Sequence, residues 1–213
     1  MMLKSIFCFC LAVMVLAPSL LQAEKNATLK PALVKTGQPS QSEAFDQKKL
    51  GKQWAVNKGE WTVSEDLLVG KELPADKHAA VLTWKLPNRN SMLRCSFQLK
   101  DAKFFHLSLN HPKGHLFRVM IDKNGMILRT DKDKKDPKSK PITLAKAQGK
   151  LDPNQWYTLQ LEMQGDQVVA QLDNGLKVAG QHPSLDSQKT GYRFVLKGDT
   201  LLLDDMAVWN LDD

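Results

Sequence analysis

Polar side chains that could bind a ligand alternate with apolar ones in FFHLSLN, residues 104–110. Successive side chains of a strand point to opposite faces, so positions 105, 107 and 109 face a core and His106, Ser108 and Asn110 face outward. The same alternation in HLFRVMI, residues 115–121, turns Arg118 outward. These groups suit sugar hydroxyls, and a guanidinium binds a carboxylate or sulfate in bidentate geometry. We predict a ligand site on these four side chains; the alternative is an ordinary polar outer face of a sheet.

An aromatic ring beside these polar groups would give a sugar ring a surface to stack on. In QWYTLQLEM, residues 155–163, the alternation sends Tyr157 to the core and Trp156 outward. Trp156 is therefore added to the predicted ligand-binding residues.

Hydrolysis of a glycosidic bond usually needs two carboxyl groups that face each other across the bond. Neighbouring acids such as Asp204 and Asp205, in LLLDDMAVW, point to opposite faces of a strand and cannot form that pair. One of the two is expected to face the buried side, where a structural hydrogen bond or a bound calcium ion would satisfy it. We predict no other cofactor, and the sequence identifies no catalytic residue.

Short β-prone segments separated by glycine, proline, asparagine and aspartate fill the chain beyond its first residues. Asn124-Gly125 and Asn174-Gly175 each join two such segments and are strong hairpin signals. Residues 104–129 are therefore expected to form a three-stranded meander. The pattern predicts an all-β fold, a two-sheet antiparallel sandwich.

The first 23 residues combine one lysine, an apolar run and a small residue at position 23, which is typical of a cleaved secretory signal peptide. Residues 24–44 lack apolar periodicity and are expected to be a flexible tether, and residues 45–213 a single domain. We expect export to the periplasm or the exterior, with no integral membrane anchor after cleavage. Only Cys95 then remains, on the apolar face of a strand, so it is expected to be a core residue.

The chain carries a formal net charge of +7, which removal of Lys4 with the leader lowers to +6. Such a surplus favours anionic partners, among them sulfated or carboxylated polysaccharides and anionic cell surfaces. Export makes nucleic acid an unsuitable partner. The charged segment 129–141 is expected to be a solvated loop; the alternative is an arm that attracts a polyanion.

Four patterns together resemble a known family: W-x-V-x-x-G-x-W-x-V over 54–63, W-Y-T-L-x-L-E-x-x-G over 156–165, D-N-G at 173–175 and the closing LLLDDMAVW. They resemble the concanavalin-A-like, laminin-G-like jelly rolls, and in particular the exported bacterial 3-keto-disaccharide hydrolase domains. The resemblance implies a jelly-roll sandwich with a concave outer face where relatives hold sugars. Where the hydrolases carry a glutamate and a glutamine, this chain has Arg118 and Met120.

Three functions are compatible with these observations. The first is an exported, non-catalytic carbohydrate- or surface-binding module, because the scaffold is present and the recognisable catalytic groups are not. The second is a glycoside hydrolase or lyase of the 3-keto-disaccharide hydrolase type, acting on oxidised sugars. The third is a structural envelope protein.

Overall fold

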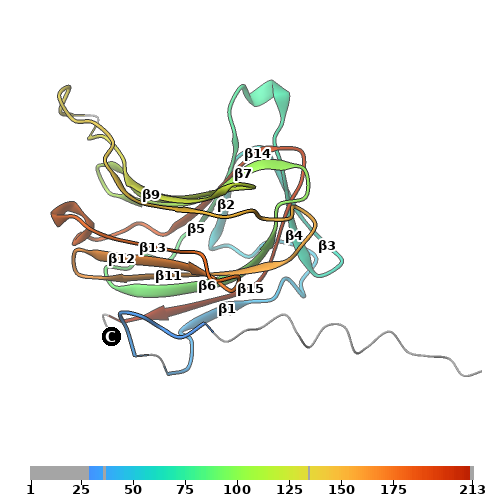
Figure 1. Cartoon of the computed structure of the whole chain (residues 1–213). Coiled ribbons are helices and arrows are strands. Elements are labelled where there is room, and N and C mark those ends of the chain that lie inside the picture. The colour runs from blue at the N-terminus through green and yellow to red at the C-terminus, as the bar shows by residue number, and fades with distance from the viewer. Residues whose placement is uncertain (1–28, 36, 134, 212–213) are drawn as a thin grey trace, which may run out of the picture.

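The computed structural model describes residues 29–35, 37–133 and 135–211, so the predicted signal peptide lies outside the described residues. These residues form two antiparallel sheets stacked face to face (Figure 1). The predicted all-β, two-sheet jelly-roll sandwich is confirmed. Within the described ranges, no helix has the length and apolar content needed to span a membrane.

The lower layer in Figure 1 is an eight-stranded sheet with the order β13-β12-β11-β6-β15-β4-β3, and β1 pairs with β15 beside this path. Its strands are β1 (Gln41–Glu43), β3 (Glu60–Ser64), β4 (Leu67–Lys71), β6 (Ser91–Gln98), β11 (Tyr157–Gln164), β12 (Gln167–Leu172), β13 (Lys177–Gln181) and β15 (Leu201–Asn210).

The upper layer is a seven-stranded sheet with the order β10-β9-β8-β7-β14-β5-β2. Its strands are β2 (Trp54–Lys58), β5 (Ala80–Trp84), β7 (Ala102–His111), β8 (Gly114–Asp122), β9 (Gly125–Thr130), β10 (Thr143–Gln148) and β14 (Tyr192–Gly198). Two short 3-10 helices, η1 (Pro74–Asp76) and η2 (Pro183–Leu185), lie in loops.

The apolar faces of the two sheets meet in one core, as the alternation predicts. Phe105, Leu107 and Leu109 of β7 are fully buried. Cys95 is also fully buried, and burial raises the pKa of its thiol to about 12, which removes it as a nucleophile at neutral pH. The predicted meander is present as β7, β8 and β9.

The turn of the β8–β9 hairpin lies one residue earlier than the Asn-Gly signal indicates. Asp122 pairs with Gly125, so Lys123 and Asn124 form the turn and Gly125 is the first residue of the next strand. Gly125 has a φ of 138°, and a Cβ there would collide with the carbonyl oxygen of Ala147 on β10. Glycine is therefore required both by the backbone conformation and by the close approach of the neighbouring strand.

The segment expected to be a tether packs on the sandwich over its described part. Residues 41–43 form β1, which pairs with the last strand, and Trp209 donates a hydrogen bond to the carbonyl of Gly37. Residues 29–34, here called the N-terminal strap, lie on the outer face of the eight-stranded sheet and appear as the blue segment below it in Figure 1. Glu162 of β11 is completely buried there and accepts hydrogen bonds from the backbone N–H groups of Ala32, Leu33 and Val34. The strap is therefore held in place by hydrogen bonds from its backbone to a buried carboxylate. The sequence pattern does not reveal this interaction.

Candidate functional site

One row of side chains crosses the outer face of the seven-stranded sheet and carries three arginines. Strand pairing places Arg129 of β9 opposite Arg118 of β8, Arg118 opposite Ser108 of β7, and Ser108 opposite Arg193 of β14. We call these four residues the arginine row. Adjacent strands lie roughly 4.8 Å apart, so the backbone positions of the three arginines fall within about 15 Å across the sheet.

Arg118 is held by a single carboxylate. Its Nη2 lies 2.7 Å from Oδ1 of Asp131, and its Nε lies 3.0 Å from Oδ2, which is a side-on pair with two hydrogen bonds. Arg129 approaches the same carboxylate more distantly, at 3.7 Å from its Nη2. Asp131 is the first residue after β9, in the segment expected to be a solvated loop, yet its side chain is only 7 % exposed. This carboxylate is therefore part of the site rather than of the loop.

Two polar side chains in the middle of the outer face are buried. His106 is 6 % exposed and Ser108 is 3 % exposed, although both point away from the core. Burial, with the positive charges of Arg118 and Arg129 adding to it, lowers the pKa of His106 to about 3. The imidazole is therefore neutral at neutral pH, and the charge of the face comes from its arginines and lysines.

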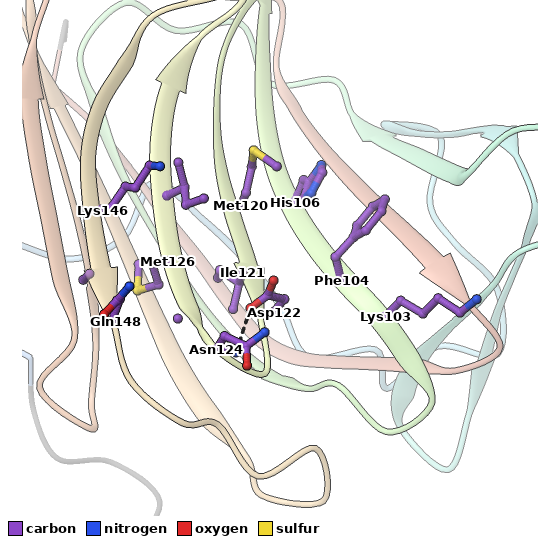
Figure 2. A pocket seen from close by; sticks show the side chains of 13 residues that line it. Lys103, Phe104, His106, Met120, Ile121, Asp122, Asn124, Met126, Lys146 and Gln148 are labelled. Carbon is purple, nitrogen blue, oxygen red and sulfur yellow. Dashed lines mark hydrogen bonds between the residues drawn. The ribbon is translucent and has the colours of Figure 1, made fainter.

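A hollow of about 310 Å³ opens on the same face, over β7 to β10 (Figure 2). One edge is formed by Phe104 and His106, whose rings stack with centroids 4.0 Å apart and planes 11° from parallel. Met120 lies next to this pair, while Lys146 and Gln148 stand at the opposite edge. One edge of the hollow is thus aromatic and the opposite edge is polar, a combination found in sites that bind small ligands.

The four strip residues predicted from alternation do share this face. His106 lines the hollow, Ser108 and Arg118 belong to the arginine row, and Asn110 pairs with His115 at the far end, with its Oδ1 3.0 Å from Nδ1 of His115. The fifth predicted residue, Trp156, is not brought to them. It directly precedes β11 in the other sheet, because QWYTLQLEM folds next to β6 rather than next to β7.

The expectation that one of Asp204 and Asp205 faces the buried side was wrong. Asp205 has a φ of 48°, and the register of β15 against β6 shifts between Asp204 and Ala207. This bulge turns both carboxylates outward, with Asp204 half-buried and Asp205 exposed, and it returns Met206 to the core. Among the described residues, no group of three or more histidine, cysteine or acidic side chains is arranged to hold a metal ion.

The residues of the site that the sequence analysis missed include Phe104, Arg129, Asp131 and Arg193, together with Lys146 and Gln148 on the rim of the hollow. Alternation in MILRT and YRFVL would have turned Arg129 and Arg193 outward. Alternation does not predict that β14 pairs with β7, about 80 residues away in the chain. Without that pairing the neighbours of Arg193 cannot be predicted.

The acidic groups on this face do not form a glycosidase pair. Asp122 is the sole acidic residue in the strands of the seven-stranded sheet. Asp122 pairs with Gly125 at the start of β9, and Asp131 lies six residues after Gly125 in the direction of that strand. About 20 Å therefore separates Asp122 from Asp131. The carboxyl pairs of glycosidases are roughly 5 to 9.5 Å apart. Asp122 and Asp131 therefore do not form such a pair.

Known structures share the architecture. No family model matches the sequence, and a search of curated proteins finds no match. The carbohydrate-binding module CBM66 from Bacillus subtilis superposes with a TM-score of 0.54 at 16 % identity, covering 74 % of this chain and 92 % of that chain. LamAcat from Zobellia galactanivorans gives 0.59 at 11 % identity, covering 81 % and 98 %. SCLam, an endo-β-1,3(4)-glucanase from family GH16, gives 0.57 at 11 % identity, covering 80 % and 90 %.

The fold is a concanavalin-like jelly roll. At these identities the likeness extends to the fold alone, and the residues of the site must carry any functional argument.

Proposed function

We propose that the chain is a non-catalytic carbohydrate-binding module whose ligand lies in the hollow on the outer face of the seven-stranded sheet. The observation that carries this proposal is the stacked Phe104–His106 pair at the edge of the hollow, with polar groups on the opposite rim. An aromatic face accepts the apolar face of a sugar ring, and the polar rim can bind its hydroxyls. The proposal includes export, on the basis of the leader predicted over residues 1–23.

Binding is proposed rather than hydrolysis for two reasons. Asp122 and Asp131 are too far apart to act on one bond, and Asp131 is already paired with Arg118. The positions at which the 3-keto-disaccharide hydrolases carry a glutamate and a glutamine hold Arg118 and Met120. We therefore propose kinship with those domains for the scaffold and not for their reaction. The jelly roll occurs both in CBM66, a module named for carbohydrate binding, and in the endo-glucanase SCLam, so the choice between binding and hydrolysis rests on the side chains of this face.

Replacement of Phe104 by alanine is expected to weaken binding about tenfold, because the stacking surface is lost while the strand remains. The parent protein and the variant are compared by affinity electrophoresis through gels that contain single neutral or acidic polysaccharides. Trp156→Ala is the matched control, since it removes an aromatic side chain next to the other sheet.

Three results would contradict the proposal. The first is that no polysaccharide retards the parent protein, and the second is that Trp156→Ala abolishes binding while Phe104→Ala does not. The third is that the parent protein releases reducing ends from a bound glycan and that an Asp122→Asn variant does not, because this would establish catalysis.

A further inference from the structure

Charge is divided unequally between the two sheets. The strands of the seven-stranded sheet contain three arginines, four lysines and one acidic residue, whereas those of the eight-stranded sheet contain five acidic and three basic residues. The positive surplus of the chain is thus concentrated on the layer that carries the hollow. A surface of one sign attracts ligands of the opposite sign and raises their local concentration.

Within the arginine row the positive charge is only partly balanced. The pair with Asp131 occupies Nε and Nη2 of Arg118, and Arg129 stands 3.7 Å from the same carboxylate. Arg193 has its Nη1 3.3 Å from the ring nitrogen of His115, which carries no negative charge. Burial and the nearby charge of Arg118 lower the pKa of Arg193, and the opposing influence of Asp131 offsets this only in part, so the fold holds this guanidinium where its charge is costly. Local rules of packing and charge are typically broken in this way at functional sites.

Two polar atoms of the row are buried and lack a hydrogen-bond partner within the described part of the chain: Oγ of Ser108 and Nε of Arg129. Ser108 is 3 % exposed and stands between Arg118 and Arg193. A buried polar group without a partner is destabilising, so native structures rarely leave one unless another group completes it. This observation is independent of the charge surplus and points to the same position.

The row and the hollow are adjacent. His106 lines the hollow, and Ser108 follows two residues later on the same face of β7, about 7 Å along the strand. One saccharide chain can therefore contact the aromatic pair and the arginine row together.

We propose that the ligand is an acidic saccharide, and that its carboxylate or sulfate binds at the arginine row between Arg129 and Arg193 while an adjoining sugar ring stacks on Phe104. This inference rests on the proposed function and specifies the ligand class of the same site. Two guanidinium groups supply bidentate donors for the oxyanion, and the hydroxyl of Ser108 adds a third donor once the arginine side chains move aside to admit the anion.

The test compares polymers that differ only in charge. Polygalacturonate is paired with its carboxyl-reduced form, and chondroitin sulfate with its desulfated form, and affinities are measured by titration calorimetry at low and physiological salt. The parent is expected to bind at least one acidic polymer at least tenfold more tightly than its neutral counterpart. Arg129→Gln and Arg193→Gln are each expected to weaken that binding about tenfold. The acidic polymer that binds tells whether the row selects carboxylate or sulfate.

Arg89→Gln is the matched control, because Arg89 lies outside the sheet in the loop before β6 and forms an exposed ion pair with Asp186. An equal loss of affinity in Arg89→Gln and Arg193→Gln would overturn the inference in favour of diffuse attraction between a basic protein and a polyanion. Arg193→Lys keeps the charge without the planar fork, and it tests the same position if Arg193→Gln has a lowered melting temperature.

The two proposals fail in different ways. One outcome is that acidic and neutral polymers bind equally, that Phe104→Ala weakens this binding and that neither arginine variant changes it. This outcome would overturn the inference of an acidic ligand and leave the carbohydrate-binding function standing. Absence of binding to all four polymers and to every neutral polysaccharide tried would overturn both.

Discussion

Replacement of Glu162 by alanine is expected to lower the free energy of unfolding by about 3 kcal/mol, the largest single effect predicted for this chain. The carboxylate is fully buried and accepts hydrogen bonds from three consecutive backbone N–H groups of the strap, at 2.7 to 3.3 Å. It also accepts a hydrogen bond from Gln160, at 2.9 Å. Alanine would leave these donors and the partly buried Arg94 without their negative partner, a loss that solvent does not repair in a buried position.

Urea unfolding of the Glu162→Ala variant at pH 7 measures this effect. Glu162→Gln keeps one carbonyl acceptor and the side-chain volume, so its loss of stability is expected to be smaller. Glu60→Ala removes an exposed carboxylate from β3 and is expected to change stability by less than about 0.5 kcal/mol. Amides of Ala32 and Leu33 are expected to exchange with solvent faster in Glu162→Ala. A loss below 1 kcal/mol with unchanged exchange would mean that the strap does not depend on this carboxylate.

Lowering the pH from 7 to 4.5 is expected to destabilise the protein by about 2 kcal/mol through His106 alone. The pKa of His106 is about 3 in the folded chain, because burial and two arginines disfavour the charged imidazole, against an ordinary value of 6.5. Above pH 6.5 both states hold a neutral ring and stability is at its full value. Between pH 6.5 and 3 the unfolded chain binds a proton that the folded chain does not, so stability falls as the pH falls.

The contribution of His106 is isolated by comparing the parent with His106→Gln, because all other titrating groups are common to both. The free energy of unfolding is measured by urea denaturation at pH 7 and at pH 4.5. The fall between the two pH values is expected to be about 2 kcal/mol smaller in the variant. Equal falls in the two proteins would show that His106 takes up a proton as readily in the folded state as in the unfolded one.

Alternation along single strands was enough to predict the faces of this fold. It placed Leu107 and Val119 in the core and His106 and Arg118 outside, because a period of two is fixed by backbone geometry and does not depend on the neighbouring strands. The hairpin signal at Asn124-Gly125 likewise predicted the pairing of β8 with β9, with the turn displaced by one residue.

What alternation cannot supply is the identity of neighbours from distant parts of the chain. Arg193 joins Ser108 through a pairing of strands far apart in sequence, and Trp156 belongs to the other sheet for the same reason. The alternation in QWYTLQLEM that turns Trp156 outward also turns Glu162 outward. Its burial depends on the strap, a segment without any apolar pattern that packs through backbone hydrogen bonds. Asp205 shows a third limit, because one bulge reverses the faces predicted for the residues that follow it.

The position of the bound saccharide is the central claim, and amide chemical-shift mapping of the labelled protein with the tightest-binding oligosaccharide tests it most directly. The predicted result is a single set of perturbed amides on β7, β8, β9 and β14, centred on Phe104 to Ser108 and Arg193, with the eight-stranded sheet unchanged. Perturbations confined to the strap, to Trp156 or to β11 and β12 would contradict the account, because they would place the ligand on the opposite face of the sandwich.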